Sequence, residues 1–235
     1  MSTPAIKNLL HAYSLANAED HAEAFWYEQA HTECKVAAHR LGVKFKHFVW
    51  AVAALSPMCY WERNIQGVVE LAQSGETGHG FRKNRDKALE CLKGNLDALK
   101  GKKVTAFAKN LFNPLDHKDD VVVDQWAIRA SLGVVAGAYP GLQPKVYDQI
   151  AEAYRVAANE VSLEPSEFQA IVWTVVRRLG KNWHTRKSQQ TRRINRNKAA
   201  AVASGDNINA QDVDADILGK GLPGGDADHL QGTNK

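Results

Sequence analysis

The sequence predicts an all-α fold, and three observations lead to that prediction. Apolar residues recur at the three- and four-residue intervals of amphipathic helices along most of residues 1–180. Only 7 of the 235 residues are proline, so few positions would interrupt a helix. No segment shows the convincing alternation of apolar and polar residues that predicts a β-sheet. We therefore expect one helical domain over residues 1–180, with two lobes at most.

The first half of this domain predicts four helices. The second of them is long and would turn alanines and aromatic residues towards the core. The third is apolar almost throughout and is closed by Ser56-Pro57. A loop with three glycines, Ser74–Gly80, follows the fourth. The expected helices are Pro4–Leu15, Glu19–Leu41, Phe45–Leu55 and Trp61–Gln73.

The second half predicts a helical hairpin and three more helices. Asp124 follows three valines and is suited to cap a helix, because its carboxylate accepts bonds from the first backbone N–H groups. Pro165 suits the first turn of a strongly amphipathic helix that continues to about Leu179. The other expected elements are the hairpin helices Arg85–Leu92 and Val104–Phe112, helices over Gln125–Leu132 and Lys145–Val161, and a loop over Val134–Gln143.

Two oppositely charged segments follow the helical domain. Residues 181–205 hold seven basic residues and no acidic one, which predicts a basic helical extension that contacts the phosphates of double-stranded DNA. The expected DNA contacts in it are Arg186, Lys187, Arg192, Arg193 and Arg196. Residues 206–235 hold six aspartates, two lysines and few large apolar residues, which predicts a disordered acidic tail.

The composition excludes several classes of protein. No apolar run approaches the roughly 18–20 residues that a membrane-spanning helix needs, and the N-terminus lacks the apolar core of a signal peptide. Three widely spaced cysteines support neither a disulfide framework nor a zinc knuckle, and they exclude a four-cysteine iron–sulfur loop. We therefore expect a monomer in the cytoplasm, with no metal, no cofactor and no membrane contact.

The turn at Gly101 and the cap at Asp124 are the segments best suited to chemistry. A glycine turn that opens a helix presents backbone N–H groups and the positive end of a dipole to a phosphate. Lys103 lies in this turn, where the dipole disfavours its charged form, and an uncharged amine is a nucleophile. The alternatives are plain: Lys103 is a solvated lysine among its basic neighbours, and Asp124 is a structural N-cap.

Together the two segments resemble the helix-hairpin-helix DNA glycosylases. Gly101-Lys102-Lys103-Val104 is similar to the Gly-x-Lys-Val end of their hairpin, and the block from Val123 to Arg129 to their Val-Asp-x-His-Val-x-Arg. The resemblance implies base excision from DNA, with Lys103 as Schiff-base nucleophile, Asp124 as its acid/base partner and Gly101 at a phosphate clamp. Lys102 is the alternative nucleophile and a DNA contact. Leu99-Lys100 stands where Pro-Gly-Val is the family pattern, and Trp126 replaces the usual histidine.

A third segment resembles the part of these glycosylases that flips a base. Ala54-Leu55-Ser56-Pro57-Met58-Cys59 is similar to their Leu-Ser-x-Gln segment, which implies that Met58 enters the gap left by the flipped base. One helical turn later Trp61, Glu62 and Asn64 are candidates for a base pocket, as is Trp126. The other interpretation of Trp61–Asn64 is an ordinary helix start with Trp61 in the core.

Residues 8–178 also resemble small uncharacterised phage and prophage proteins with the motif Ala-Leu-Ser-Pro…Trp-Glu-Arg-Asn, here Ala54–Asn64. Three functions follow from the two resemblances. The first is a DNA glycosylase with abasic-site lyase activity, acting in base excision repair. The second is a non-catalytic phage-encoded DNA-binding protein on the same scaffold, located in the host cytoplasm. The third is a base-modifying transferase.

Overall fold

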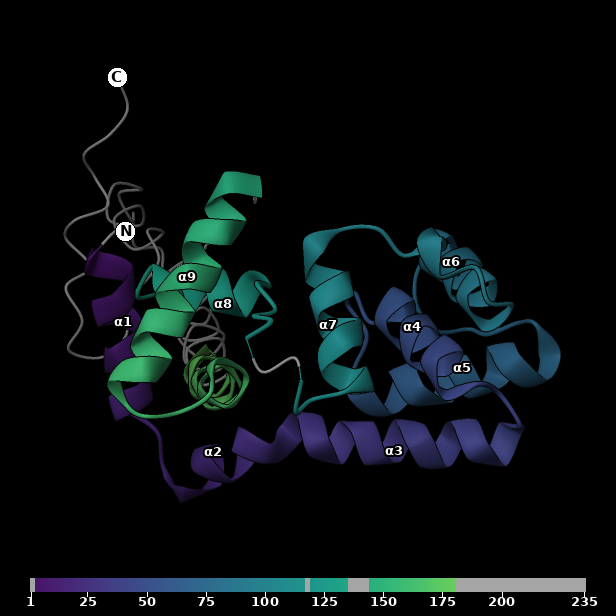
Figure 1. The fold of residues 1–235 in the computed structure, drawn as a ribbon, viewed down its shortest axis with the longest axis horizontal. Helices are drawn as coiled ribbons and strands as arrows, with labels where there is room; N and C mark the ends of the chain where they lie inside the picture. The colour runs from purple at the N-terminus through teal and green to yellow at the C-terminus, as the bar shows by residue number, and fades with distance from the viewer. Residues whose placement is uncertain (1–2, 117–118, 135–143, 181–235) are drawn as a thin grey trace, which may run out of the picture.

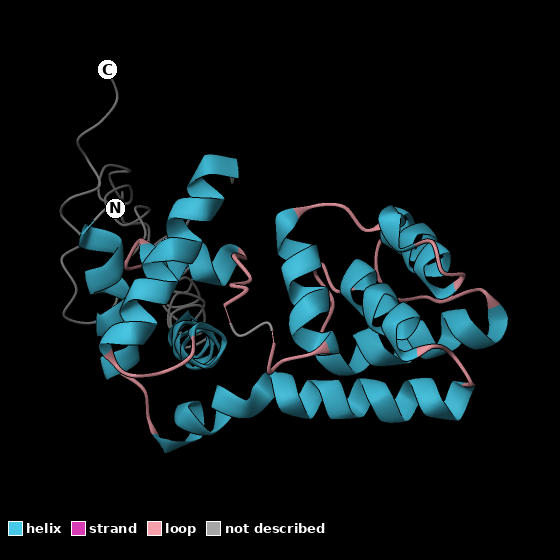
Figure 2. Ribbon diagram, in the orientation of Figure 1, coloured by secondary structure: helices cyan, strands magenta, loops and turns pink. Residues whose placement is uncertain are grey.

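The computed structural model describes residues 3–116, 119–134 and 144–180. Within these ranges the chain forms helices and no strand, which confirms the all-α prediction (Figure 2). The helices are α1 (Thr3–Ser14), α2 (Ala18–Ala22), α3 (Trp26–Leu41), α4 (Phe45–Leu55), α5 (Trp61–Ser74), α6 (Arg82–Leu92), α7 (Lys102–Phe112), α8 (Gln125–Ser131), α9 (Pro144–Glu160) and a helix over 165–180. The segments 181–205 and 206–235 lie outside the described residues.

The helices pack around two separate hydrophobic cores. One core belongs to α1, α8, α9 and the helix over 165–180, which we call the terminal lobe. The other belongs to α3 to α7, which we call the central lobe. Figure 1 shows the terminal lobe on the left and the central lobe on the right, with α2 and α3 along the lower edge. The terminal lobe thus combines α1, from the start of the chain, with helices that begin only at Gln125.

One predicted helix, Glu19–Leu41, was wrong as a single element. The structure divides it into α2, a 3₁₀ turn over Glu23–Phe25, and α3. The two helices serve different lobes: Asp20 of α2 bonds to Arg178 on the helix over 165–180, whereas Tyr27 of α3 is buried in the central core. Because a straight helix would not satisfy both contacts, the chain changes direction between them.

Boundaries elsewhere differ by a turn or less. Helix α6 begins at Arg82 rather than Arg85, and α7 begins at Lys102 rather than Val104. Helix α3 ends at Leu41 and is capped by Gly42, whose φ of 63° is the left-handed conformation that follows many helices and that glycine adopts without strain.

Candidate functional site at the lobe junction

The turn between α6 and α7 holds a glycine just before α7, at a position whose backbone conformation favours glycine. Gly101 is the N-cap of α7, with φ 114° and ψ 135°, a conformation that residues with a Cβ rarely adopt. An added Cβ would come no closer than 3.8 Å to a neighbouring atom, so the constraint is conformational rather than steric. The sequence-predicted turn is thus present, with the first N–H groups of α7 directly behind it.

The two lysines after Gly101 have different surroundings. Lys102 lies at the surface, and its Nζ is 2.6 Å from both carboxylate oxygens of Asp148 on α9. Lys103 is half-buried. Burial raises the pKa of Asp124, and the positive charge of Lys103 is one of the influences that oppose the rise. The charge of Lys103 therefore acts on Asp124, whereas Lys102 joins the hairpin to α9 of the terminal lobe.

Asp124 uses both oxygens of its carboxylate. Its Oδ1 accepts hydrogen bonds from the backbone N–H of Trp126 at 2.8 Å and of Ala127 at 2.9 Å, which caps α8 as predicted. Its Oδ2 accepts a bond from the indole Nε1 of Trp173 at 3.2 Å. Burial raises the pKa of Asp124 above its ordinary value, while these bonds and the charge of Lys103 oppose the rise.

The extended segment 121–123 places Asp124 between the lobes. Val121 and Val123 pack into the terminal core and Val122 into the central core, because successive side chains of extended backbone point to opposite sides. Gln169 bonds to both the N–H and the carbonyl of Val122, and the hydroxyl of Tyr147 donates to the carbonyl of Val121 at 2.8 Å. This segment, which we call the junction strap, is therefore fixed by the terminal lobe.

Two buried tyrosines lie close enough to Asp124 for its charge to affect them. They are Tyr27 from α3 and Tyr154 from α9. Burial, and after it the negative charge of Asp124, raises the pKa of each phenol above its ordinary value. The Tyr154 hydroxyl has no hydrogen-bond partner among the described residues. The charge of Asp124 thus acts on phenols from both lobes.

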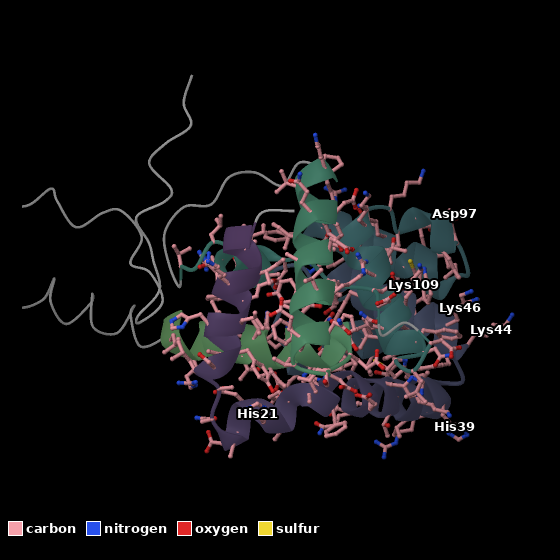
Figure 3. All side chains as sticks on the ribbon, turned by 60° about the vertical axis from the view of Figure 1, so that its left-hand side comes forward. His21, His39, Lys44, Lys46, Asp97 and Lys109 are labelled. Atoms are coloured by element: carbon pink, nitrogen blue, oxygen red, sulfur yellow. The ribbon has the colours of Figure 1, made fainter. Side chains whose placement is uncertain are left out.

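A groove of about 500 Å³ separates α7 from α9 next to this junction. Its charged side chains are paired: Lys102 with Asp148, Lys109 with Asp120 at 3.5 Å, and Arg155 with Glu152. Figure 3 labels Lys109 of this groove. The other labelled lysines, Lys44 and Lys46, lie at the edge of the central lobe and do not line the groove. Neither Lys103 nor Asp124 lines this groove.

Met58 lies in an exposed position in the loop between α4 and α5. Its side chain is 84% exposed, the highest value among the large hydrophobic residues of the described chain, and its φ is 62°. Tyr60 in the same loop and Phe81 at the start of α6 are also exposed. The loop thus holds an apolar side chain in solvent at the cost of a strained backbone.

The candidate base-pocket residues are divided between the lobes. Trp61 packs edge-on against Trp26, and its indole donates to Glu33 at 2.6 Å. Asn64 is buried and donates to the carbonyl of Val52 on α4, which joins α4 to α5, whereas Glu62 is exposed.

Trp126 belongs to the terminal lobe, where its ring lies 4.7 Å from the guanidinium of Arg129. The contacts of Trp61, Asn64 and Trp126 are thus packing and hydrogen-bonding contacts within the fold.

The described residues contain no group of three or more His, Cys, Asp and Glu side chains suited to a metal ion. None of the helices in the described ranges is both long and apolar enough to cross a membrane.

The sequence profile of a family of unknown function, DUF7178, matches residues 1–180. The chain belongs to DUF7178. No curated protein and no solved structure matched it. The DUF7178 match ends at the residue where the described helices end, so it includes both lobes and the junction between them. The predicted DNA contacts Arg186, Lys187, Arg192, Arg193 and Arg196 lie outside both the match and the described residues.

Sequence reasoning missed the residues that hold Asp124 in place. Trp173 and Gln169 lie four positions apart on the helix over 165–180, so they share one side of it. The apolar stripe predicted for this helix includes neither of them. A glutamine and a tryptophan one turn apart, beside an apolar stripe, were the signal for a second, polar contact surface.

Proposed function

We propose that this DUF7178 protein is a DNA glycosylase with abasic-site lyase activity, built on a helix-hairpin-helix glycosylase-like fold. The observation that carries the proposal is the electrostatic influence of Lys103 on Asp124. These residues are separated by 21 positions and belong to different lobes, yet the lysine's charge acts on the carboxylate. An amine beside a carboxylate at an interlobe junction suits the attack of a nucleophile on a sugar carbon whose positive charge is developing.

The surroundings of the two lysines favour Lys103 as the nucleophile. The amine must lose a proton before it attacks, and an ion pair with a carboxylate opposes that loss. Lys102 is engaged by both oxygens of Asp148 at 2.6 Å, and its pairing favours a role in holding the lobes and meeting a phosphate. Lys103 is half-buried, and its charge acts on Asp124 without the close ion pair that holds Lys102.

The proposed reaction uses Asp124 as a fixed negative charge. Lys103 first releases its ammonium proton to water; the uncharged amine then attacks C1′, the bond from the sugar to the base breaks, and the base leaves with the bonding electrons and takes up the proton that the attacking nitrogen releases. The Asp124 carboxylate stabilises the positive charge on the sugar during this step. Three hydrogen bonds occupy only part of the roughly four lone-pair sites of a carboxylate, so Asp124 retains acceptor capacity. Opening of the sugar gives the Schiff base, from which β-elimination breaks the 3′ phosphate ester.

Two further features support DNA as the substrate. The N-terminus of α7, directly after Gly101, offers backbone N–H groups to a phosphate. Met58, held in solvent by a left-handed backbone, offers an apolar side chain to the gap that a flipped nucleotide leaves. In the proposal these two contacts hold the duplex while the extruded nucleotide enters the junction.

Borohydride trapping on a duplex with one abasic site tests the proposal. The wild type is expected to form a covalent adduct that Lys103→Ala abolishes and that Asp124→Asn slows by about 100-fold or more, as loss of an electrostatic catalytic group does. Lys93→Ala is the matched control, because it removes an exposed lysine of the same hairpin that pairs only with its own helix. Lys102→Ala is expected to weaken duplex binding and keep the adduct.

An adduct that survives in Lys103→Ala and disappears in Lys102→Ala would transfer the nucleophile to Lys102. No adduct with the wild type, together with salt-sensitive binding of the duplex, would overturn the lyase and favour a non-catalytic DNA-binding protein. Two observations favour that second function. The capping bonds of Asp124 are those of a structural N-cap. The neighbouring groove includes neither Asp124 nor Lys103.

A further inference from the structure

The indole of Trp173 contacts Asp124 from the helix over 165–180. Its Nε1 lies 3.2 Å from Oδ2 of the carboxylate. One turn later on the same helix, the guanidinium carbon of Arg177 lies 4.6 Å from the centroid of the same indole. Stacking by Arg177 restricts the ring, so the N–H is held towards the carboxylate.

Trp173 makes the two oxygens of Asp124 different from one another. Both backbone N–H groups of the α8 cap donate to Oδ1. If the carboxylate turned over, Oδ2 could accept the same two bonds, so the cap alone does not distinguish the two oxygens. The third bond, at Oδ2, fixes the rotation of the carboxyl plane. A hydrogen bond to an ionised group also stabilises the charged form, the form that the proposed reaction uses.

We propose that Trp173 is a positioning residue: its indole N–H favours the charged form of Asp124 and fixes the plane of its carboxylate at the lobe junction. The catalytic consequence of this role rests on the proposed function. The contact itself does not, because it concerns two residues of the free protein.

The other groups that act on the charge of Asp124 come from three helices. They are Lys103 from α7, Tyr27 from α3 and Tyr154 from α9. Lys103 is a cation that favours the carboxylate, and the two phenols remain neutral because burial raises the pKa of each. Trp173 does not titrate, so its removal changes the acidity of Asp124 without adding a second titration.

Trp173→Phe tests the proposal in the full-length protein, because it removes the N–H and keeps an aromatic ring. The pKa of Asp124, followed by the carboxyl carbon signal in an NMR titration, is expected to rise further above its ordinary value. The acidic limb of the single-turnover trapping rate is expected to move to higher pH by the same amount. The rate at neutral pH is expected to fall about tenfold, as loss of a hydrogen bond to a charged group does, while the Kd for abasic duplex stays unchanged.

Two comparisons separate this role from a merely structural one. Trp50→Phe makes the same chemical change in the central lobe, away from Asp124, and is expected to leave the titration and the pH profile unchanged. If Trp173→Phe fails to fold, a benzothienyl side chain at position 173 replaces the N–H by sulfur at nearly constant shape.

The outcomes are distinguishable. An unchanged titration of Asp124 in the position-173 variant overturns the proposal, even if the wild type is an active lyase. A raised pKa of Asp124 in a protein that forms no adduct overturns the lyase and supports the assignment of Trp173.

Discussion

Lys102 and Lys103 have the same side chain and adjacent positions at the start of α7, yet they face different partners. Successive residues of a helix are about 100° apart, so Lys102 pairs with Asp148 on α9 whereas the charge of Lys103 acts on Asp124. The hairpin and the aspartate were predictable from sequence spacing. Which lysine meets Asp124 was not, because that depends on how α7 is rotated against the terminal lobe.

Met58 carries a backbone strain that can be relieved. Its φ of 62° costs about 1 kcal/mol for a residue with a Cβ and nothing for glycine. Because 84% of the side chain is exposed, little buried contact is lost on its removal. Met58→Gly is therefore expected to increase the free energy of unfolding by about 0.5–1 kcal/mol, measured by urea denaturation.

The same variant also tests the proposed contact with DNA. Met58→Gly should weaken the binding of a duplex that requires base flipping, whereas Met58→Leu should retain it. Equal affinity of all three proteins would assign Met58 no part in DNA binding.

Asp124 and Trp173 are expected to be coupled in stability. In Asp124→Asn the amide oxygen can keep the cap, but its NH₂ group then faces the indole N–H, and two donors oppose each other. The change in unfolding free energy caused by Asp124→Asn should therefore be less unfavourable in a Trp173→Phe background, by about 1–2 kcal/mol. Urea denaturation of the four proteins measures this difference, and additive effects would contradict the bond.

At the scale of elements, the junction strap depends on one helix that packs beside it. Gln169 is buried and satisfies both backbone groups of Val122, which lies between the two cores. Backbone polar groups that are buried without partners are costly. Gln169→Leu preserves the approximate volume and is expected to lower the free energy of unfolding by about 2–3 kcal/mol.

Hydrogen exchange locates the damage that Gln169→Leu is expected to cause. Faster exchange at Val122, with unchanged protection in α4 and α5, would identify the strap as the weakened element. Uniform loss of protection would instead indicate a general defect of packing.

The helices were largely predictable from the sequence, because each buries a continuous apolar face and local periodicity reports that face. The division of Glu19–Leu41 was not, since it arises from the bond between Asp20 and Arg178, which are 158 positions apart. The site shows the same limit. Asp124 was predicted as a cap from its neighbours, but its bond from Trp173 and its electrostatic influence on Tyr27 and Tyr154 depend on how distant helices come together.

At the scale of the whole molecule, one ion pair joins α2 to the terminal lobe. Arg178 bonds to both oxygens of Asp20, at 3.2 and 2.6 Å, and to the carbonyl of Leu15 at 3.0 Å. Asp20 is 1% exposed, so loss of its partner leaves a buried and uncompensated charge. Arg178→Ala is expected to lower the free energy of unfolding by about 3 kcal/mol at neutral pH, measured by urea denaturation. Arg40→Ala, on the exposed end of α3, is the matched control.

The cost of Arg178→Ala is expected to depend on pH. Burial by itself would raise the pKa of Asp20, but the bonds from Arg178 and the backbone of Asn17 outweigh it and lower the pKa below the ordinary 3.8. Stability from a carboxyl with a lowered pKa is present above its unfolded value and is lost as pH falls through the folded value. Without Arg178 burial raises the pKa of Asp20, so the difference between wild type and Arg178→Ala should shrink as pH falls through the raised folded pKa of the variant and vanish below the lowered folded pKa of the wild type. An equal difference at pH 3 and pH 7 would contradict a charged role for Asp20.

The assembly of the terminal lobe from both ends of residues 3–180 sets an order for biosynthesis. A ribosome delivers α1 first and the helix over 165–180 roughly 10–30 s later, at the usual 5–20 residues per second. The central lobe lies within one continuous stretch, so its core can close in the interval. Leu9 and Ala12, which are 0% exposed in the finished protein, gain partners only as α8, α9 and then the helix over 165–180 are synthesised. The nascent chain therefore exposes the apolar face of α1 while the central lobe is already able to fold.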